Sequence, residues 1–110
     1  MKGWFKATMG MLAFFFFLIT ANVGFLNGQD LVSEGKGLYQ AECALCHLDN
    51  GLGYGINPAL AGLNESEILQ MLEGYQDGTY GGANAALMSV YIQGKSQQQL
   101  QAMAAYIATL

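Results

Sequence analysis

The stretch AECALCHLDN, residues 41–50, contains both cysteines and the only histidine of the chain. Cys43 and Cys46 are three residues apart, and His47 follows directly. On a helix, residues three apart lie on the same face, so the two thiols would point the same way with an imidazole beside them. A cluster this dense, in a chain that has these residue types nowhere else, indicates a shared chemical task.

Two uses of such a cluster fit poorly. Thiol–disulfide exchange sites normally lie in a βαβ setting with a thiolate at a helix N-terminus, whereas this pair ends a predicted helix in a chain without strand patterns. Zinc sites need four ligands, and no second cluster completes the set. A structural disulfide would close a very small loop and would therefore stabilise the fold little.

Covalent haem explains the spacing better. Cys-x-x-Cys-His is the attachment signature of c-type haem. Cys43 and Cys46 would form thioethers with two vinyl groups on one edge of the ring, and His47 would be the proximal ligand of the iron. The sequence therefore predicts one covalently bound haem c.

The first 28 residues differ in character from the rest. Lys2 and Lys6 precede an apolar run at residues 9–19, which is the pattern of a secretory signal. Further apolar residues extend this run toward the ~18 that a membrane helix needs. We therefore expect residues 1–28 to be a signal peptide or a membrane anchor. Residues 29–110 would then be one domain, periplasmic or otherwise exported.

The charge of the exported domain limits its partners. Residues 29–110 contain all eight acidic residues but only Lys36 and Lys95, which leaves a net charge of −6, and the chain has no arginine. Nucleic acid is excluded as a partner, because binding to it depends on neutralising phosphates with Lys and Arg. Basic protein partners, or partners met through weakly charged patches, fit this surface better.

Helical periodicity predicts the fold. Apolar residues recur at helical spacing in three long segments and a short one: residues 31–47, 64–78, 96–110 and 88–93. Asn64 with Glu67, and Ser96 with Gln99, have the spacing of capping boxes. Two glycine-rich loops lie between the helices, and loops this long are uncommon in a small domain unless they wrap something. We predict an all-α domain of three to four helices wrapped around the haem, which would complete a core that is otherwise too small.

From residue 35 to the end, the chain resembles the small single-haem class I cytochromes c of bacteria. Segment GKGLYQAECALCH resembles the first helix of that family, with Gly35 and Tyr39 at the family's spacing before the first cysteine. Segment AMAAYI resembles its last helix, whose aromatic residue, here Tyr106, crosses the first helix at that glycine. Segment NPALAGL resembles the loop whose proline carbonyl, here that of Pro58, accepts a hydrogen bond from the proximal imidazole.

The resemblance also implies a sixth iron ligand. The segment that begins at Met88 resembles the one that carries the family's axial methionine. Met71 and Met103 instead fall on apolar helical stripes, where a methionine is more often core than ligand. Met88 alone follows a glycine-rich loop. We therefore predict His47 and Met88 as the axial ligands.

Ligation by His and Met leaves no open position for a substrate and raises the reduction potential of the iron. The predicted function is therefore one-electron transfer between redox proteins of a respiratory chain, without substrate turnover. One alternative is a haem subunit of a larger oxidoreductase, in contact with the membrane only if the N-terminal segment is retained. Another is a haem c sensor that binds a gas after losing Met88.

Overall fold

The computed structural model describes residues 27–110, so the predicted export segment lies almost wholly outside the described residues. Five helices make up the described region: α2 (Gly28–Glu42), α3 (Ala44–His47), α4 (Glu65–Asp77), α5 (Ala85–Ile92) and α6 (Gln97–Ile107). Beside them, residues 27–110 contain one isolated bridge, between Tyr54 and Asn57. The prediction of an all-α domain is confirmed. Within residues 27–110, every helix is too short or too polar to cross a membrane.

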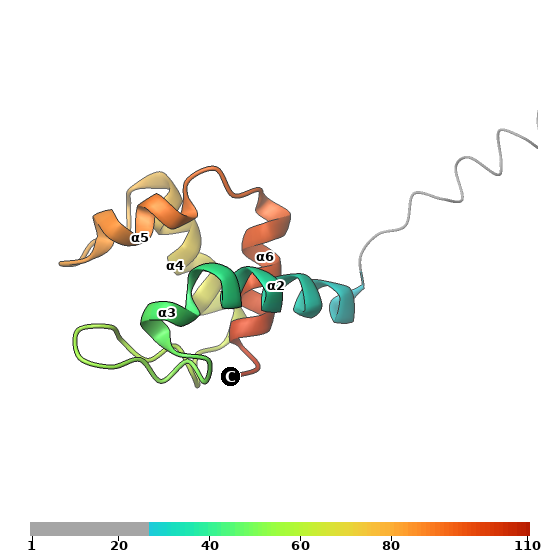
Figure 1. Ribbon diagram of the computed structural model, residues 1–110. Helices are drawn as coiled ribbons and strands as arrows, with labels where there is room; N and C mark the ends of the chain where they lie inside the picture. Colours follow the sequence, from blue (N-terminus) through green and yellow to red (C-terminus); the bar gives the residue numbers. More distant parts are fainter. Residues whose placement is uncertain (1–26) are drawn as a thin grey trace, which may run out of the picture.

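Helices α2 and α6 cross in close contact (Figure 1). The crossing point is Gly35, which is buried in the middle of α2. A Cβ at this position would collide with the carbonyl oxygen of Ala102 and would lie 2.9 Å from Cβ of Tyr106. The absence of a side chain is therefore what allows the two backbones to approach, as predicted for the crossing of the first and last helices.

The caps of α4 and α6 follow the sequence signals. The Asn64 side chain accepts a hydrogen bond from the Glu67 N–H, and the Glu67 carboxylate accepts one from the Asn64 N–H. Ser96 and Gln99 make the same reciprocal pair at the start of α6. Gly78 ends α4 in the left-handed conformation, which glycine adopts without strain. Both capping boxes are confirmed.

The buried core lies where α2, α4 and α6 meet. Its centre is Tyr39, which is fully buried and packs against Tyr106 with ring centroids 5.4 Å apart. The other buried members come from α4, α5 and α6: Ile68, Leu72, Ile92, Leu100, Met103, Ala104 and Ile107. The prediction that Met103 belongs to the core is confirmed, because its side chain is 1% exposed.

Several helix boundaries differ from the sequence-based prediction, and two of these differences bear on the site. The single helix expected over residues 31–47 is divided at Cys43, whose φ of −106° departs from helical geometry. The helical hydrogen bonds resume at once, because the His47 N–H bonds to the Cys43 carbonyl at 2.9 Å. Helix α3 is thus a single helical turn that follows α2 directly (Figure 1). Helix α5 begins at Ala85, so Met88 lies within a helix rather than at its start.

Candidate functional site

His47 ends helix α3 and is 6% exposed, the one buried polar or charged side chain among the described residues. Its Nδ1 lies 2.9 Å from the carbonyl oxygen of Pro58. A carbonyl oxygen only accepts hydrogen bonds, so Nδ1 donates and carries the ring proton. In the neutral ring the lone pair then lies on Nε2 and is available for a metal, and the Pro58 contact fixes the orientation of the ring.

The loop that presents Pro58 depends on Gly53. The Gly53 N–H bonds to the His47 carbonyl at 3.0 Å, and its φ of 65° is one that side chains rarely adopt. A Cβ there would collide with the Asn57 carbonyl and would lie 2.7 Å from the Pro58 carbonyl oxygen. Gly53 therefore lets the chain fold back tightly enough to bring the Pro58 carbonyl to the imidazole.

Tyr39 fixes the other side of this turn. Its hydroxyl donates a 2.5 Å hydrogen bond to the carbonyl of Leu48, the residue after His47. Leu48 has a φ of 65°, a conformation in which a branched residue is strained. Burial, with smaller contributions from neighbouring ionisable groups, raises the pKa of Tyr39 to about 12. The phenol is therefore neutral and can donate throughout the physiological pH range.

Cys43 and Cys46 are free, half-buried thiols at the start and within the turn of α3. The Cys46 N–H bonds to the Cys43 carbonyl at 3.2 Å, so both residues belong to one helical turn. Burial, and to a smaller extent the Glu42 carboxylate, raises the pKa of Cys43 to about 11. Reactive exchange thiols have a lowered pKa, so Cys43 lacks the property that thiol–disulfide exchange requires.

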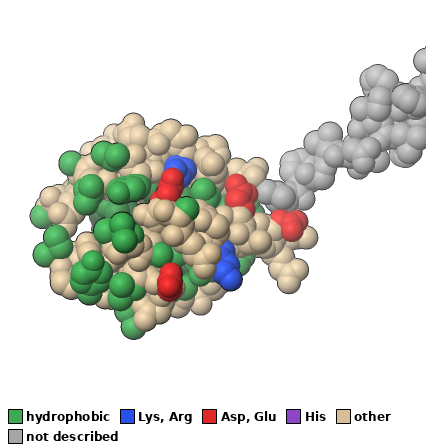
Figure 2. All heavy atoms as spheres, viewed as in Figure 1, with side chains coloured by type: hydrophobic (Ala, Val, Ile, Leu, Met, Phe, Trp, Pro, Cys, Tyr) green, Lys and Arg blue, Asp and Glu red, His purple; other side chains and the backbone are tan. Residues whose placement is uncertain are grey.

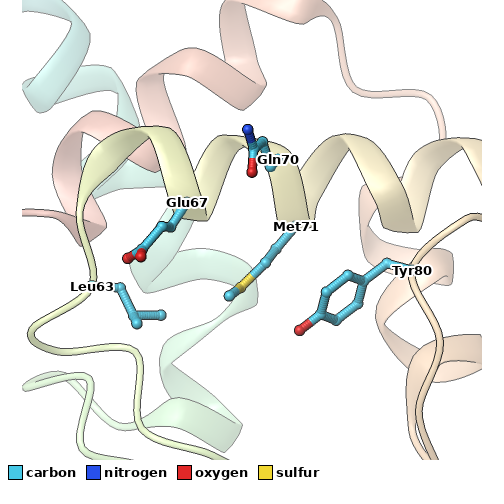
Figure 3. Close-up of a pocket in the computed structure, with 5 residues that line it drawn as sticks. All are labelled: Leu63, Glu67, Gln70, Met71 and Tyr80. Atoms are coloured by element: carbon cyan, nitrogen blue, oxygen red, sulfur yellow. The ribbon is translucent and has the colours of Figure 1, made fainter.

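Met88 and Met71 lie on different elements. Met88 is half-buried on α5, which is tied to α4 because the Ser89 hydroxyl donates to the Tyr75 carbonyl at 3.0 Å. Met71 is half-buried on α4 and lines a cavity of about 280 Å³ with Leu63, Glu67, Gln70 and Tyr80. In Figure 3, Met71 on α4 and Tyr80 in the loop after it point toward the same space. Met71 is thus less enclosed than its position on an apolar stripe predicted. Of the predicted site residues, the structure brings His47 and Pro58 together, and Met88 lies on a separate helix.

Apolar side chains that face solvent gather at one end of the domain. Figure 2 shows hydrophobic groups concentrated over the end formed by α3, α5 and the loop after α3. Four large apolar side chains beside or after the cysteines are more than half exposed: Leu45, Leu52, Tyr54 and Ile56. Three more large side chains are exposed on α5: Leu87, Val90 and Tyr91. An apolar surface of this kind marks a binding site for an apolar ligand or a partner.

These observations fit a covalently held haem. The two thiols of one turn match the two thioethers, and the buried imidazole with a free Nε2 matches an axial ligand. The exposed apolar side chains beside them suit a large flat ring.

Two interactions next to the site have no local sequence signal: the Tyr39–Leu48 hydrogen bond, and an ion pair between Glu42 and Lys95. Their partners are nine and 53 residues apart, so only the folded chain reveals them.

Comparison with known proteins agrees with this chemistry. Residues 32–110 match the family model for cytochrome c. The chain is 38% identical to cytochrome c-554(547) of Halothiobacillus neapolitanus, over 71% of this chain and 94% of that protein. It is 32% identical to cytochrome c-553 of Nitratidesulfovibrio vulgaris, over 84% of this chain and 91% of that protein.

The fold and the site thus define a small helical haem protein of the class I c type. The chain belongs to the cytochrome c family. The predicted cofactor, haem c, is confirmed, and Cys43, Cys46 and His47 fit its Cys-x-x-Cys-His motif. The chain is accordingly a haem electron carrier that works with redox partners.

Proposed function

We propose that this protein is an exported one-electron carrier with a single haem c, held by thioethers at Cys43 and Cys46 and ligated by His47 and Met88. When bound, the haem iron supplies the chemistry by alternating between the ferric and ferrous states. The protein itself turns over no substrate. Its partners are redox proteins of a respiratory chain, and residues 1–28 direct its export to the periplasm.

The contact between His47 and the Pro58 carbonyl carries this proposal. It keeps the ring proton at Nδ1 and the Nε2 lone pair free. Because the imidazole is 6% exposed, water has little access to its ring. An oriented imidazole on the same turn as two free thiols is what axial ligation of a covalently attached haem needs. Tyr39 and Gly53 would support this geometry from either side.

Met88 is proposed as the sixth ligand because of its place on the chain and in the fold. Met103 is enclosed in the core and Met71 lines a cavity on α4, whereas Met88 lies on α5 at the end of the domain where apolar side chains are exposed. A thioether ligand favours ferrous iron and so suits a carrier of relatively high potential.

Spectra of the haem-loaded protein in both redox states test these assignments. We expect a reduced c-type spectrum, and in the oxidised protein the weak long-wavelength band that Met–Fe ligation produces. Haem should stay on the chain after denaturation, and the ferrous protein should not bind carbon monoxide at neutral pH. Carbon monoxide binding by the native protein would instead indicate an open site and a gas-binding role.

A further inference from the structure

A salt bridge joins the end of α2 to the turn between α5 and α6. Lys95 Nζ lies 2.8 Å from Oε2 of Glu42 and donates a 3.0 Å hydrogen bond to Oε1. The Lys95 side chain is 14% exposed and that of Glu42 is 31% exposed. This is the single ion pair formed within residues 27–110. It is better shielded from water than the exposed pairs whose contribution is usually small.

The main chain at Lys95 is held in place independently of this ion pair. The Gln76 side chain on α4 donates a 2.8 Å hydrogen bond to the Lys95 carbonyl, and the Lys95 N–H bonds to the Ile92 carbonyl at 3.2 Å. The Gln93 side chain also donates to the Gln76 carbonyl at 3.3 Å. The turn is therefore fixed to α4 without the ammonium group, which points to an electrostatic role for the Lys95 charge.

The carboxylate of Glu42 depends on that charge. Its Oε2 is buried and receives no hydrogen bond of good geometry from residues 27–110, so Lys95 Nζ is the compensating group. Glu42 directly precedes Cys43. The ion pair therefore lies next to the first attachment residue.

We propose that Lys95 neutralises Glu42 beside the first haem attachment residue and thereby sets the reduction potential. The inference rests on the proposed attachment of haem at Cys43. Ferric haem has one more positive charge than ferrous haem, so a nearby negative charge favours the oxidised state and a nearby positive charge favours the reduced state. The charges of the paired Glu42 and Lys95 largely cancel. When either is removed, the charge that remains at this partly buried site is weakly screened.

Midpoint potentials of haem-loaded variants test this role. Lys95→Gln should lower the potential because it leaves the Glu42 carboxylate unpaired, and Glu42→Gln should raise it because it leaves the Lys95 ammonium unpaired. The double variant should return close to wild type, and Lys95→Arg should retain the wild-type value. Matched controls are Lys36→Gln and Asp30→Asn, which make the same charge changes at exposed positions of α2 and should give smaller shifts.

A mechanical role for the ion pair predicts a different pattern. If the pair only held the turn, both single variants and the double variant would weaken the Met–Fe band and shift the potential in the same direction. Shifts of one sign, or shifts no larger than those of the controls, would overturn the inference while the proposed function stands. A wild-type chain that loses all haem on denaturation would overturn the proposed attachment, and this inference with it.

Discussion

Two glycines of helix α2 provide a paired test of the helix crossing. Gly35 and Gly37 have helical neighbours on both sides, so replacing either by alanine should gain about 1 kcal/mol of helix propensity. The two positions differ in their surroundings. A Cβ at Gly37 meets nothing within 4 Å, whereas a Cβ at Gly35 would lie 2.5 Å from the Ala102 carbonyl carbon and nearer still to its oxygen.

The cost at Gly35 follows from this geometry. Real Cβ contacts are essentially never below 3.0 Å, so α2 and α6 must separate by at least 0.5 Å for the carbonyl carbon and by more for the oxygen. Backbone atoms cannot rotate away, so we expect a cost near the upper end of the ~1–3 kcal/mol typical of overpacking. After the gain in propensity, Gly35→Ala should destabilise the protein by about 2 kcal/mol and Gly37→Ala should stabilise it by about 1 kcal/mol.

Thermal unfolding of the oxidised haem-loaded protein, followed by circular dichroism, measures both effects. For a domain of this size about 1 kcal/mol corresponds to ~4–8 °C, so the two variants should differ in Tm by at least ~12 °C. The stabilised Gly37→Ala variant serves as the control for propensity. If Gly35→Ala were as stable as wild type, the reasoning on the crossing would be refuted.

Three further predictions concern ligation, pH and docking. Met88→Leu should abolish the Met–Fe band, lower the potential and allow carbon monoxide binding, whereas Met71→Leu and Met103→Leu should keep the band; the reverse pattern would contradict the assignment. The pKa of Tyr39 rises from 10.0 to about 12 on folding, so the stability that its neutral phenol provides is complete below pH 10 and is lost as the pH rises toward 12. Tyr39→Phe should therefore flatten the curve of unfolding free energy against pH between these values. Electron transfer to a basic partner should slow as salt increases, and a flat profile would indicate apolar docking.

Local interactions explain which elements of the fold were predictable. The capping boxes at Asn64 and Ser96 join residues three apart, and Gly78 ends α4 through its own backbone preference. Such signals act within one turn of chain, so the sequence contains them whole. The division at Cys43 was not predictable in this way, because apolar residues at helical spacing continue across it and only one residue leaves helical geometry.

Contacts across the fold explain the features of the site that the sequence missed. The turn after His47 is held by Tyr39, and the charge beside Cys43 is balanced by Lys95. The spacing of Tyr39 marked it as a family residue of the first helix but gave no sign that its hydroxyl bonds to the Leu48 carbonyl. Lys95 did not stand out at all, since residues 29–110 include a second lysine. Cys43, Cys46 and His47 are recognisable because they cluster along the chain. The residues that support them come from elsewhere, Tyr39 from α2 and Lys95 from the turn between α5 and α6.

The distribution of apolar side chains ties the cofactor to the fold itself. The core where α2, α4 and α6 meet relies partly on alanine, and only Tyr39, Ile92, Leu100 and Met103 are large side chains buried below 2% exposure among the described residues. At the other end, Leu45 and Ile56 are 82% and 79% exposed. Burial of apolar surface gives roughly 25 cal/mol per Å², so this end contributes little to stability until something covers it. The neighbouring thiols of Cys43 and Cys46 attach a haem, and this haem covers the exposed apolar side chains. The haem that transfers electrons therefore also completes the core, which explains why so short a chain needs few other large side chains.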